Sequence, residues 1–296
     1  MKNKSIAGHL SVLFTVIIWA TTFISTKVLL SYLKPSEILL IRFIIGLAAL
    51  FIAFPKRLEN TDIKQEMTFA AAGLCGITLY YLFENVALTY TMASNVGVMV
   101  STAPFFTAIL THIFIKDGER LRVNFFIGFA VAMAGILMIN LSGSRLEISP
   151  KGDILALLAA VVWGFYSVLT KKISGYGYNT ILTTRRIFIY GIAFMLPALL
   201  MLGFKPDIHS IAEPICLLNI IYLGLGASAL CFVTWNFAVN VLGPVRTGVY
   251  IYIQPAITIA ASVLILKERV TALSLAGALL TAAGLVISEY KGGRAV

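Results

Sequence analysis

Ten apolar runs of membrane-spanning length account for most of this 296-residue chain. They lie at residues 10–30, 37–55, 68–89, 94–115, 122–141, 152–172, 180–203, 214–238, 244–266 and 271–290. A helix needs about 20 mostly apolar residues to cross the hydrocarbon core of a bilayer. Barrel strands would alternate polar and apolar residues over about 10 positions, and these runs do not. Because only helices and closed barrels satisfy their backbone in lipid, the pattern predicts an all-α polytopic membrane protein with ten transmembrane helices.

Charged residues make up only 12% of the chain, whereas a soluble domain carries about 25%. The net charge of +10 could suggest a nucleic-acid partner, but the charges lie in short connections beside the runs. With the N-terminus placed in the cytoplasm, cytoplasmic connections hold 13 Lys and Arg residues and the opposite ones hold 6. This bias follows the positive-inside rule. We therefore expect no nucleic-acid partner, and a multi-pass protein of the cell membrane with both termini cytoplasmic.

The chain repeats itself in order. Trp19, Lys27 and Arg42 recur 144 residues later as Trp163, Lys171 and Arg186. At an offset of 151, Asn85 and Pro104 recur as Asn236 and Pro255, and at 149 Glu119 recurs as Glu268. Each copy holds five runs, an odd number, so the second copy enters the membrane from the opposite side. The sequence therefore predicts two inverted five-helix repeats, residues 1–145 and 146–296, an architecture typical of secondary transporters.

Two pairs of repeated motifs resemble those of a known family. "WATTFISTK" at residues 19–27 is echoed at 163–171, and "ASNVGVMVSTAPFFTAIL" parallels "VRTGVYIYIQPAITIAAS". With these motifs the chain resembles the drug/metabolite transporter superfamily, in particular its ten-helix EamA-type members. The resemblance implies a central cavity lined by helices 1–4 and 6–9. It also implies alternating-access transport of small organic metabolites, such as amino acids or related compounds, or of drugs, with export favoured.

Aromatic and polar side chains deep in the runs are candidates for that cavity. An apolar, aromatic cavity with few polar groups suits a small organic ligand. Aromatic residues near run ends can instead anchor a helix at the membrane surface. The candidate substrate-cavity residues are Trp19, Tyr80, Tyr81, Glu84, Trp163, Tyr166, Tyr250, Tyr252 and Gln254.

Two prolines lie halfway along equivalent runs, Pro104 in the fourth and Pro255 in the ninth. A proline inside a helix removes one backbone hydrogen bond and frees the carbonyl four residues earlier. Their mirrored placement indicates hinges or cavity walls at the centre of the membrane, although a static kink would serve packing alone.

Four cations at or near the ends of runs form candidate charged layers: Lys27, Arg42, Lys171 and Arg186. Long cations near helix ends often reach the headgroups. Glu84 is the only acid well inside a run, and an intramembrane acid is a functional candidate. We expect Glu84, Arg42 and Lys27 to share a layer on the outer side. Glu84 could form a structural ion pair with Arg42, act at an outer gate, contact a substrate amine or couple transport to protons.

The sequence lacks the residues that an enzyme or a channel would need. The three histidines are scattered and no Gly-x-Ser-x-Gly, metal-binding or phosphate-binding motif is present in the sequence. A channel would need repeated pore charges or a carbonyl filter. An intramembrane enzyme and a channel remain the alternatives. We expect a non-enzymatic carrier of a small-molecule substrate, without cofactor or metal, acting as a monomer or weak homodimer.

Overall fold

The computed structural model describes residues 2–115, 123–141, 149–202, 204–205, 207–268 and 270–289. Within these residues the chain makes ten helical passes and no strand. Passes one to five are α1 Lys2–Leu29; α2 Pro35–Ala53; α3 Ile63–Gly73 with η1 Leu74–Leu79 and α4 Tyr80–Tyr90; α5 Ala93–Val100 with α6 Ala103–Phe114; and α7 Val123–Leu141. Passes six to ten are α8 Pro150–Ser174; α9 Thr180–Leu202; α11 Pro214–Ile221 with η2 Tyr222–Leu230 and α12 Cys231–Leu242; α13 Pro244–Gly248 with η3 Val249–Ile253, α14 Gln254–Ala261 and η4 Ser262–Leu266; and α15 Ala272–Glu289. A short helix, α10 Ile208–Ala212, joins passes seven and eight.

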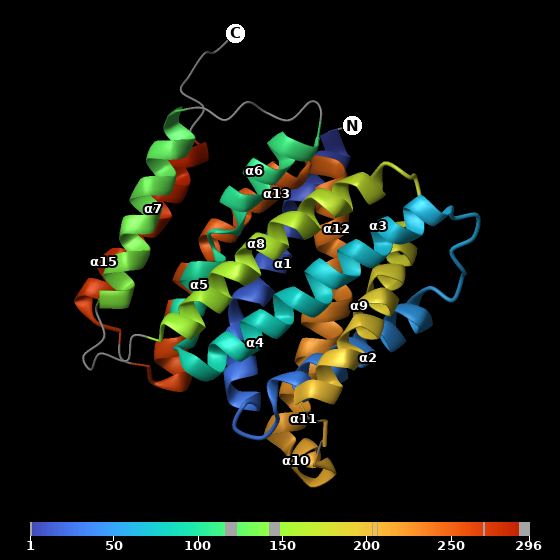
Figure 1. Ribbon diagram of the computed structural model, residues 1–296, viewed down its shortest axis with the longest axis horizontal. Helices are drawn as coiled ribbons and strands as arrows, with labels where there is room; N and C mark the ends of the chain where they lie inside the picture. The colour runs from blue at the N-terminus through green and yellow to red at the C-terminus, as the bar shows by residue number, and fades with distance from the viewer. Residues whose placement is uncertain are drawn as a thin grey trace.

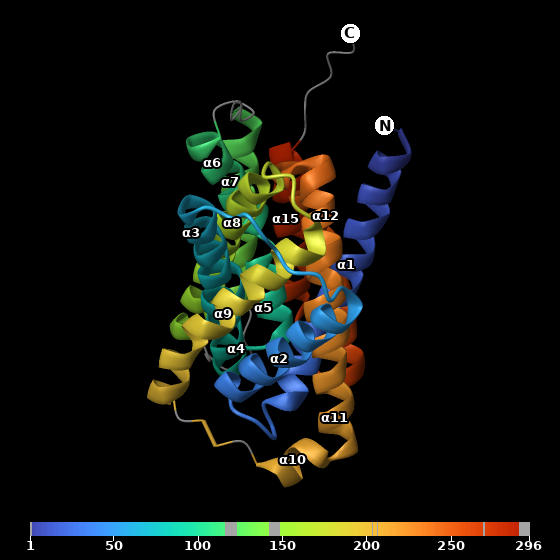
Figure 2. The same cartoon turned by 90° about the vertical axis from the view of Figure 1, so that its right-hand side faces the viewer.

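The passes run side by side as a membrane protein requires (Figure 2). Eight of them are long and apolar enough to cross a bilayer, and α7 and α15 contain shorter apolar stretches. Large apolar side chains such as Ile52, Leu200 and Leu264 point outward, where lipid would cover them. α1 begins and α15 ends at one end of the bundle, and α10 lies at the other (Figure 1). The predicted all-α polytopic membrane fold is confirmed.

Mirrored local geometry supports the inverted repeat. A π-helical segment interrupts pass three at Leu74–Leu79 and pass eight at Tyr222–Leu230, and an offset of 151 carries 74–79 onto 225–230. Two glycines related by the same offset lie at close approaches: Gly73, just before the first segment, and Gly224, within the second. A Cβ on Gly73 would lie 2.6 Å from the carbonyl oxygen of Ile187 in pass seven, and one on Gly224 would lie 3.2 Å from that of Arg42 in pass two. Passes three and eight therefore pack on passes seven and two in equivalent ways.

Both prolines begin a new helical segment. Pass four breaks after Val100 and resumes at Ala103, with Pro104 in the first turn of α6. Pass nine runs as a 3₁₀ helix from Val249 to Ile253, and Pro255 lies in the first turn of α14. The sequence predicted these interruptions from the missing backbone donor. A role as hinges stays a prediction.

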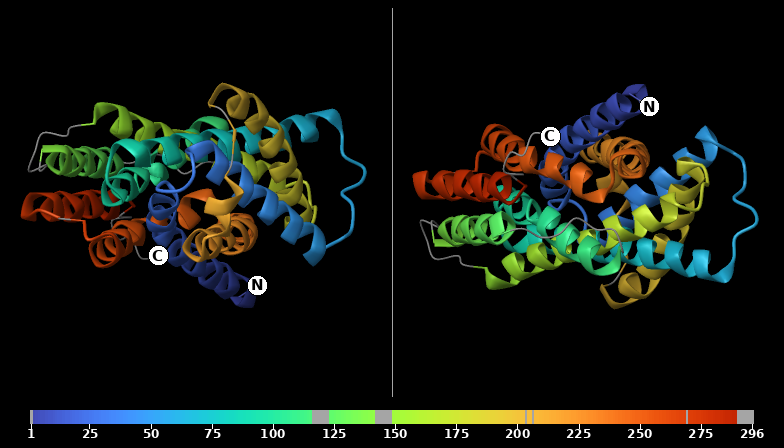
Figure 3. Two further views of the ribbon diagram at one scale, coloured as in Figure 1. Left: turned by 90° about the horizontal axis from the view of Figure 1, so that it is seen from below. Right: turned by 90° about the horizontal axis from the view of Figure 1, so that it is seen from above.

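Passes five and ten lie together at one edge of the bundle. Seen along the bundle, α7 and α15 are on one side and the α2–α3 connection is on the other (Figure 3). A Cβ on Gly135 would lie 2.5 Å from backbone atoms of Gly277 and Thr281. Small residues therefore let the two backbones touch, and they leave passes one to four and six to nine to enclose the centre. The predicted repeat boundary at residues 145 and 146 lies outside the described residues.

Candidate functional site

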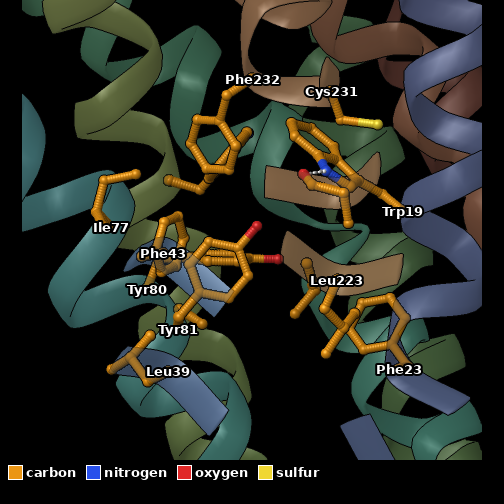
Figure 4. Close-up of a cluster of buried hydrophobic side chains, with 14 of the residues drawn as sticks. Trp19, Phe23, Leu39, Phe43, Ile77, Tyr80, Tyr81, Leu223, Cys231 and Phe232 are labelled. Carbon is orange, nitrogen blue, oxygen red and sulfur yellow. Dashed lines mark hydrogen bonds between the residues drawn. The ribbon is translucent and has the colours of Figure 1, made fainter. Parts of the chain in front are cut away.

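All three tryptophans of the chain meet at the centre of the bundle. The Trp19 ring centroid lies 5.1 Å from that of Trp163 and 5.1 Å from that of Trp235, and the latter two are 5.5 Å apart. The Trp19 indole nitrogen donates to the Ala227 carbonyl in η2 at 3.0 Å (Figure 4). Passes one, six and eight are thus joined at one aromatic cluster, which mixes residues from both repeats.

Further rings extend this cluster toward passes two and three. Tyr80 lies 4.9 Å from Trp163 and 4.7 Å from Tyr81, between ring centroids. Phe43 and Phe232 complete the wall beside Tyr81 (Figure 4). The cavity candidates chosen from the sequence did not include Phe43, Phe232 or Trp235. The offset of 151 could have found two of them, because it carries Tyr81 onto Phe232 and Glu84 onto Trp235.

A small pocket lies against these rings, with a volume of about 10 Å³. That is roughly the room one water molecule needs, so this conformation is closed around its centre. The lining residues come from passes one, three, four, six and nine: Trp19, Thr22, Phe23, Tyr80, Tyr81, Glu84, Val100, Ala103, Trp163, Ile251 and Gln254. Val100 and Ile251 are the two residues whose carbonyls the prolines were expected to free. Both helix breaks therefore form part of the pocket wall.

Glu84 is the one acidic side chain that lines this pocket. Its side chain is only 1% exposed, and its Oε1 atom has no hydrogen-bond partner. The next residue, Asn85, donates to the Pro35 carbonyl at 3.2 Å and so ties pass three to the start of pass two. Glu84 is therefore held in a tightly packed region with an acceptor left over.

Arg42 lies behind the tyrosines and is fully buried. Its Nε donates to the Ser228 hydroxyl in η2 at 3.0 Å, and its guanidinium carbon lies 4.4 Å from the centre of the Tyr81 ring. Both terminal nitrogens, Nη1 and Nη2, lack a partner. Arg42 forms no direct ion pair with Glu84, which was one of the alternatives for Glu84. Over the described ranges, the one ion pair within 4.0 Å joins Arg186 to Glu66.

The Lys27 ammonium contacts neither Arg42 nor Glu84, although the three side chains were expected to share a layer. Its ammonium donates to the carbonyls of Leu88 and Thr91, the latter at 2.9 Å, where α4 ends. Nearby, the Glu268 carboxylate accepts hydrogen bonds from the Ala93 amide and the Ser94 hydroxyl at the start of α5. These two charges therefore cap helix ends at one face of the bundle.

The opposite face is tied together by the second repeat's arginines. Arg186 lies 3.4 Å from Glu66, whose other carboxylate oxygen accepts from the Tyr190 hydroxyl at 2.6 Å. Arg185 donates to the carbonyls of Phe54 and Lys56. These contacts hold the α2–α3 connection against α9. Lys171 lies half-buried at the end of α8.

The remaining candidates divide by position. Tyr166 is buried and donates to Asn236 at 2.8 Å, one ring behind Trp163. Gln254 lines the pocket, and its side chain makes no hydrogen bond with another residue that the structure describes. The Tyr250 hydroxyl instead lies 2.7 Å from Nδ1 of His9. Tyr252 packs against the small apolar cluster that contains Phe105. The 3₁₀ turn explains this split, because positions three apart share a face and residues 251 and 254 take the pocket side.

Known proteins resemble the chain over nearly its whole length. The EamA-like transporter family model matches residues 6–141 and 150–290. An uncharacterized transporter of Archaeoglobus fulgidus is 27% identical, covering 96% of this chain and 97% of its own. A probable amino-acid metabolite efflux pump of Escherichia coli is 26% identical, covering 94% and 93%. A probable terminal-alkyne amino-acid exporter of Streptantibioticus cattleyicolor is 27% identical, covering 94% and 91%. A solved crystal structure shares the fold, with a TM-score of 0.68 at 17% identity over 98% of this chain and 97% of its own.

Proposed function

The chain belongs to the EamA-like transporter family of the drug/metabolite transporter superfamily, and we propose that it exports small organic metabolites by alternating access. Amino acids and related compounds are the favoured substrates, with drugs as a wider class. One observation carries the proposal. The pocket lies where mirrored elements of both repeats meet, and both proline breaks form its wall.

The closed pocket supports a cycle rather than an open pore. A volume of about 10 Å³ excludes any metabolite, since pockets that hold small organic ligands span roughly 300–1,000 Å³. Substrate must therefore enter when the bundle opens at one face. Inverted repeats supply two such openings of similar energy, one at each face.

The choice of substrate class rests on chemistry and on relatives. Aromatic walls suit an apolar side chain, and Glu84 adds an acceptor for an amine. One relative is named as a probable terminal-alkyne amino-acid exporter and another as a probable amino-acid metabolite efflux pump. We place the protein in the cell membrane with both termini cytoplasmic, as two repeats at 1–145 and 146–296, acting as a monomer or weak homodimer. We also propose that Glu84 couples transport to the movement of protons.

Counterflow into proteoliposomes tests the function. Purified protein is reconstituted with unlabelled L-phenylalanine, L-leucine or L-threonine inside, and the same labelled amino acid is added outside. A carrier gives saturable uptake that the internal amino acid accelerates, and protein-free liposomes give none. A flux that never saturates would indicate a channel. Conversion of the probe into a product would indicate an enzyme, and absence of counterflow with all three would refute the amino-acid assignment.

A further inference from the structure

Arg42 has a hydrogen-bonding capacity that the closed protein does not use. Its side chain is fully buried, yet Nη1 and Nη2 have no partner. Each buried donor that is left without an acceptor costs free energy, and more so when the group is charged. A position with such a cost is expected to have a partner at another stage of the protein's cycle.

The surroundings hold the guanidinium in a fixed orientation. Ser228 takes only Nε, and the Tyr81 ring covers one face of the group at 4.4 Å. Gly46, one turn further along α2, lets Ser228 approach, because a Cβ there would lie 3.1 Å from the serine Cβ. The two free nitrogens thus remain as a planar fork, the geometry that matches a carboxylate through two parallel hydrogen bonds.

Tyr81 contacts both this fork and the pocket. It lines the pocket, and the guanidinium lies over its ring. A change in the Tyr81 side chain would therefore join the fork to the pocket without moving Arg42. Trp163 adds a further donor on the pocket wall, since its indole nitrogen has no partner.

The complementary acceptor lies in the same pocket. Glu84 Oε1 is buried and unpartnered. One buried cation and one buried anion sum to zero charge, so a zwitterion enters with no net charge left uncompensated. An amine or an acid alone would leave one of the two without a partner.

We propose that Arg42 is a carboxylate-binding residue, which takes the substrate's carboxylate through Nη1 and Nη2 while Glu84 accepts its ammonium group. This assignment deepens the proposed export of amino-acid-like metabolites and rests on it. It makes the α-amino and α-carboxylate groups, rather than the side chain, the part of the substrate that the charged residues recognise.

Matched probes test the two ends of the substrate separately. Calorimetric titration of the purified protein uses L-phenylalanine, phenethylamine, which lacks the carboxylate, and 3-phenylpropanoate, which lacks the ammonium group. L-leucine, isoamylamine and 4-methylpentanoate form a second set. The wild type should bind each amino acid about 10- to 100-fold more tightly than its amine or its acid, the usual effect of one charged hydrogen-bonded contact.

Two variants should then separate the probes. Arg42→Met should weaken the binding of the amino acid and of the acid by about 10- to 100-fold and should leave the binding of the amine unchanged. Glu84→Gln should weaken the binding of the amino acid and of the amine and should leave the binding of the acid unchanged. Lys172→Met, which removes an exposed charge at the end of α8, is the matched control and should bind all probes as the wild type does.

Several results would overturn the assignment. An equal loss of affinity for all three probes in Arg42→Met would mean that Arg42 only supports the fold. Unchanged affinity would exclude Arg42 from the binding site. Failure of both amino acids to bind the wild type would also overturn the assignment. If Arg42→Met does not fold, Arg42→Lys keeps the charge without the fork and must weaken the acid more than the amine. Normal counterflow without this probe pattern would refute the assignment while leaving the proposed function in place.

Discussion

Arg42 and Arg186 occupy the same position of the two repeats, 144 residues apart, and have opposite surroundings. Arg42 is fully buried, stacks on Tyr81 and leaves two nitrogens free. The Arg186 side chain is 30% exposed and pairs with Glu66. The repeat places an arginine at each of the two equivalent positions, and the neighbouring side chains determine what each arginine contacts. One arginine is left for a ligand, and the other holds a connection in place.

The same asymmetry appears one pass away. Glu84 in pass three has Trp235 as its counterpart in pass eight, at an offset of 151. The backbone is therefore nearly symmetric while the charged chemistry belongs to the first repeat. A site built this way can open to either face through equivalent movements and still bind its substrate in one orientation.

The largest expected effect contrasts the two arginines directly. Arg42→Met should lower the initial rate of amino-acid counterflow by about 10- to 150-fold, because a charged hydrogen-bonded contact is lost. Arg186→Met should lower it by less than about 5-fold, since a partly exposed ion pair contributes roughly 1 kcal/mol or less. Equal losses in the two variants, at equal amounts of folded protein, would remove the distinction.

Glu84→Gln keeps the shape of the side chain and removes its charge. Uptake should fall by about 10-fold, and the rate should lose its dependence on pH if Glu84 carries a coupled proton. The measurement is counterflow and gradient-driven uptake across a series of pH values. Transport like that of the wild type at every pH would exclude Glu84 from both substrate binding and coupling. Rescue of a poorly folded Glu84→Gln by Arg42→Met would instead point to a structural charge pair.

The prolines test whether the mirrored breaks matter in the same way. Pro104→Ala and Pro255→Ala each restore a backbone donor and should straighten passes four and nine. Transport should drop several-fold more than the yield of folded protein, measured by size-exclusion chromatography beside the flux assay. If both variants transport normally, the breaks serve packing alone.

The smallest effect concerns the contacts around Arg186. Glu66→Gln removes the ion pair and should favour opening at that face by no more than about 5-fold, the change in population that 1 kcal/mol allows. Thr183→Cys, in a background without native cysteines, reports on this opening, because Thr183 is buried and lines a second small pocket among passes six to eight. Faster labelling of Thr183→Cys by a membrane-impermeant maleimide is expected. Slower labelling would contradict the role of the pair as a closing contact.

Much of the architecture follows from pattern alone. Apolar length predicted ten passes, recurrence of rare residues predicted the inverted pair, and Pro104 and Pro255 predicted the breaks. The π-helical segments were not predicted, because their signal is only a mirrored pair of glycines, Gly73 and Gly224, whose meaning depends on the helix that packs there.

Side-chain partners were harder to predict than positions. Depth within a run placed Arg42, Glu84 and Lys27 in one layer, but depth does not determine which way a long side chain turns. Lys27 donates to free carbonyls at a helix end, and the Arg42 guanidinium stacks on the Tyr81 ring. Tyr250 and Tyr252 were expected beside Gln254, and the local 3₁₀ turn directs them elsewhere in this closed form.

Intrinsic tryptophan fluorescence tests the central claim most directly. Every tryptophan of the chain lies in the aromatic cluster, with ring centroids no more than 5.5 Å apart. All indole emission therefore reports on the proposed binding site. If L-leucine, which does not absorb at the excitation wavelength, binds there, its titration should change the emission saturably, with a midpoint that matches half-saturation of counterflow, and Arg42→Met should abolish the change at those concentrations. Emission that stays constant while L-leucine saturates transport would place the substrate elsewhere and contradict the account.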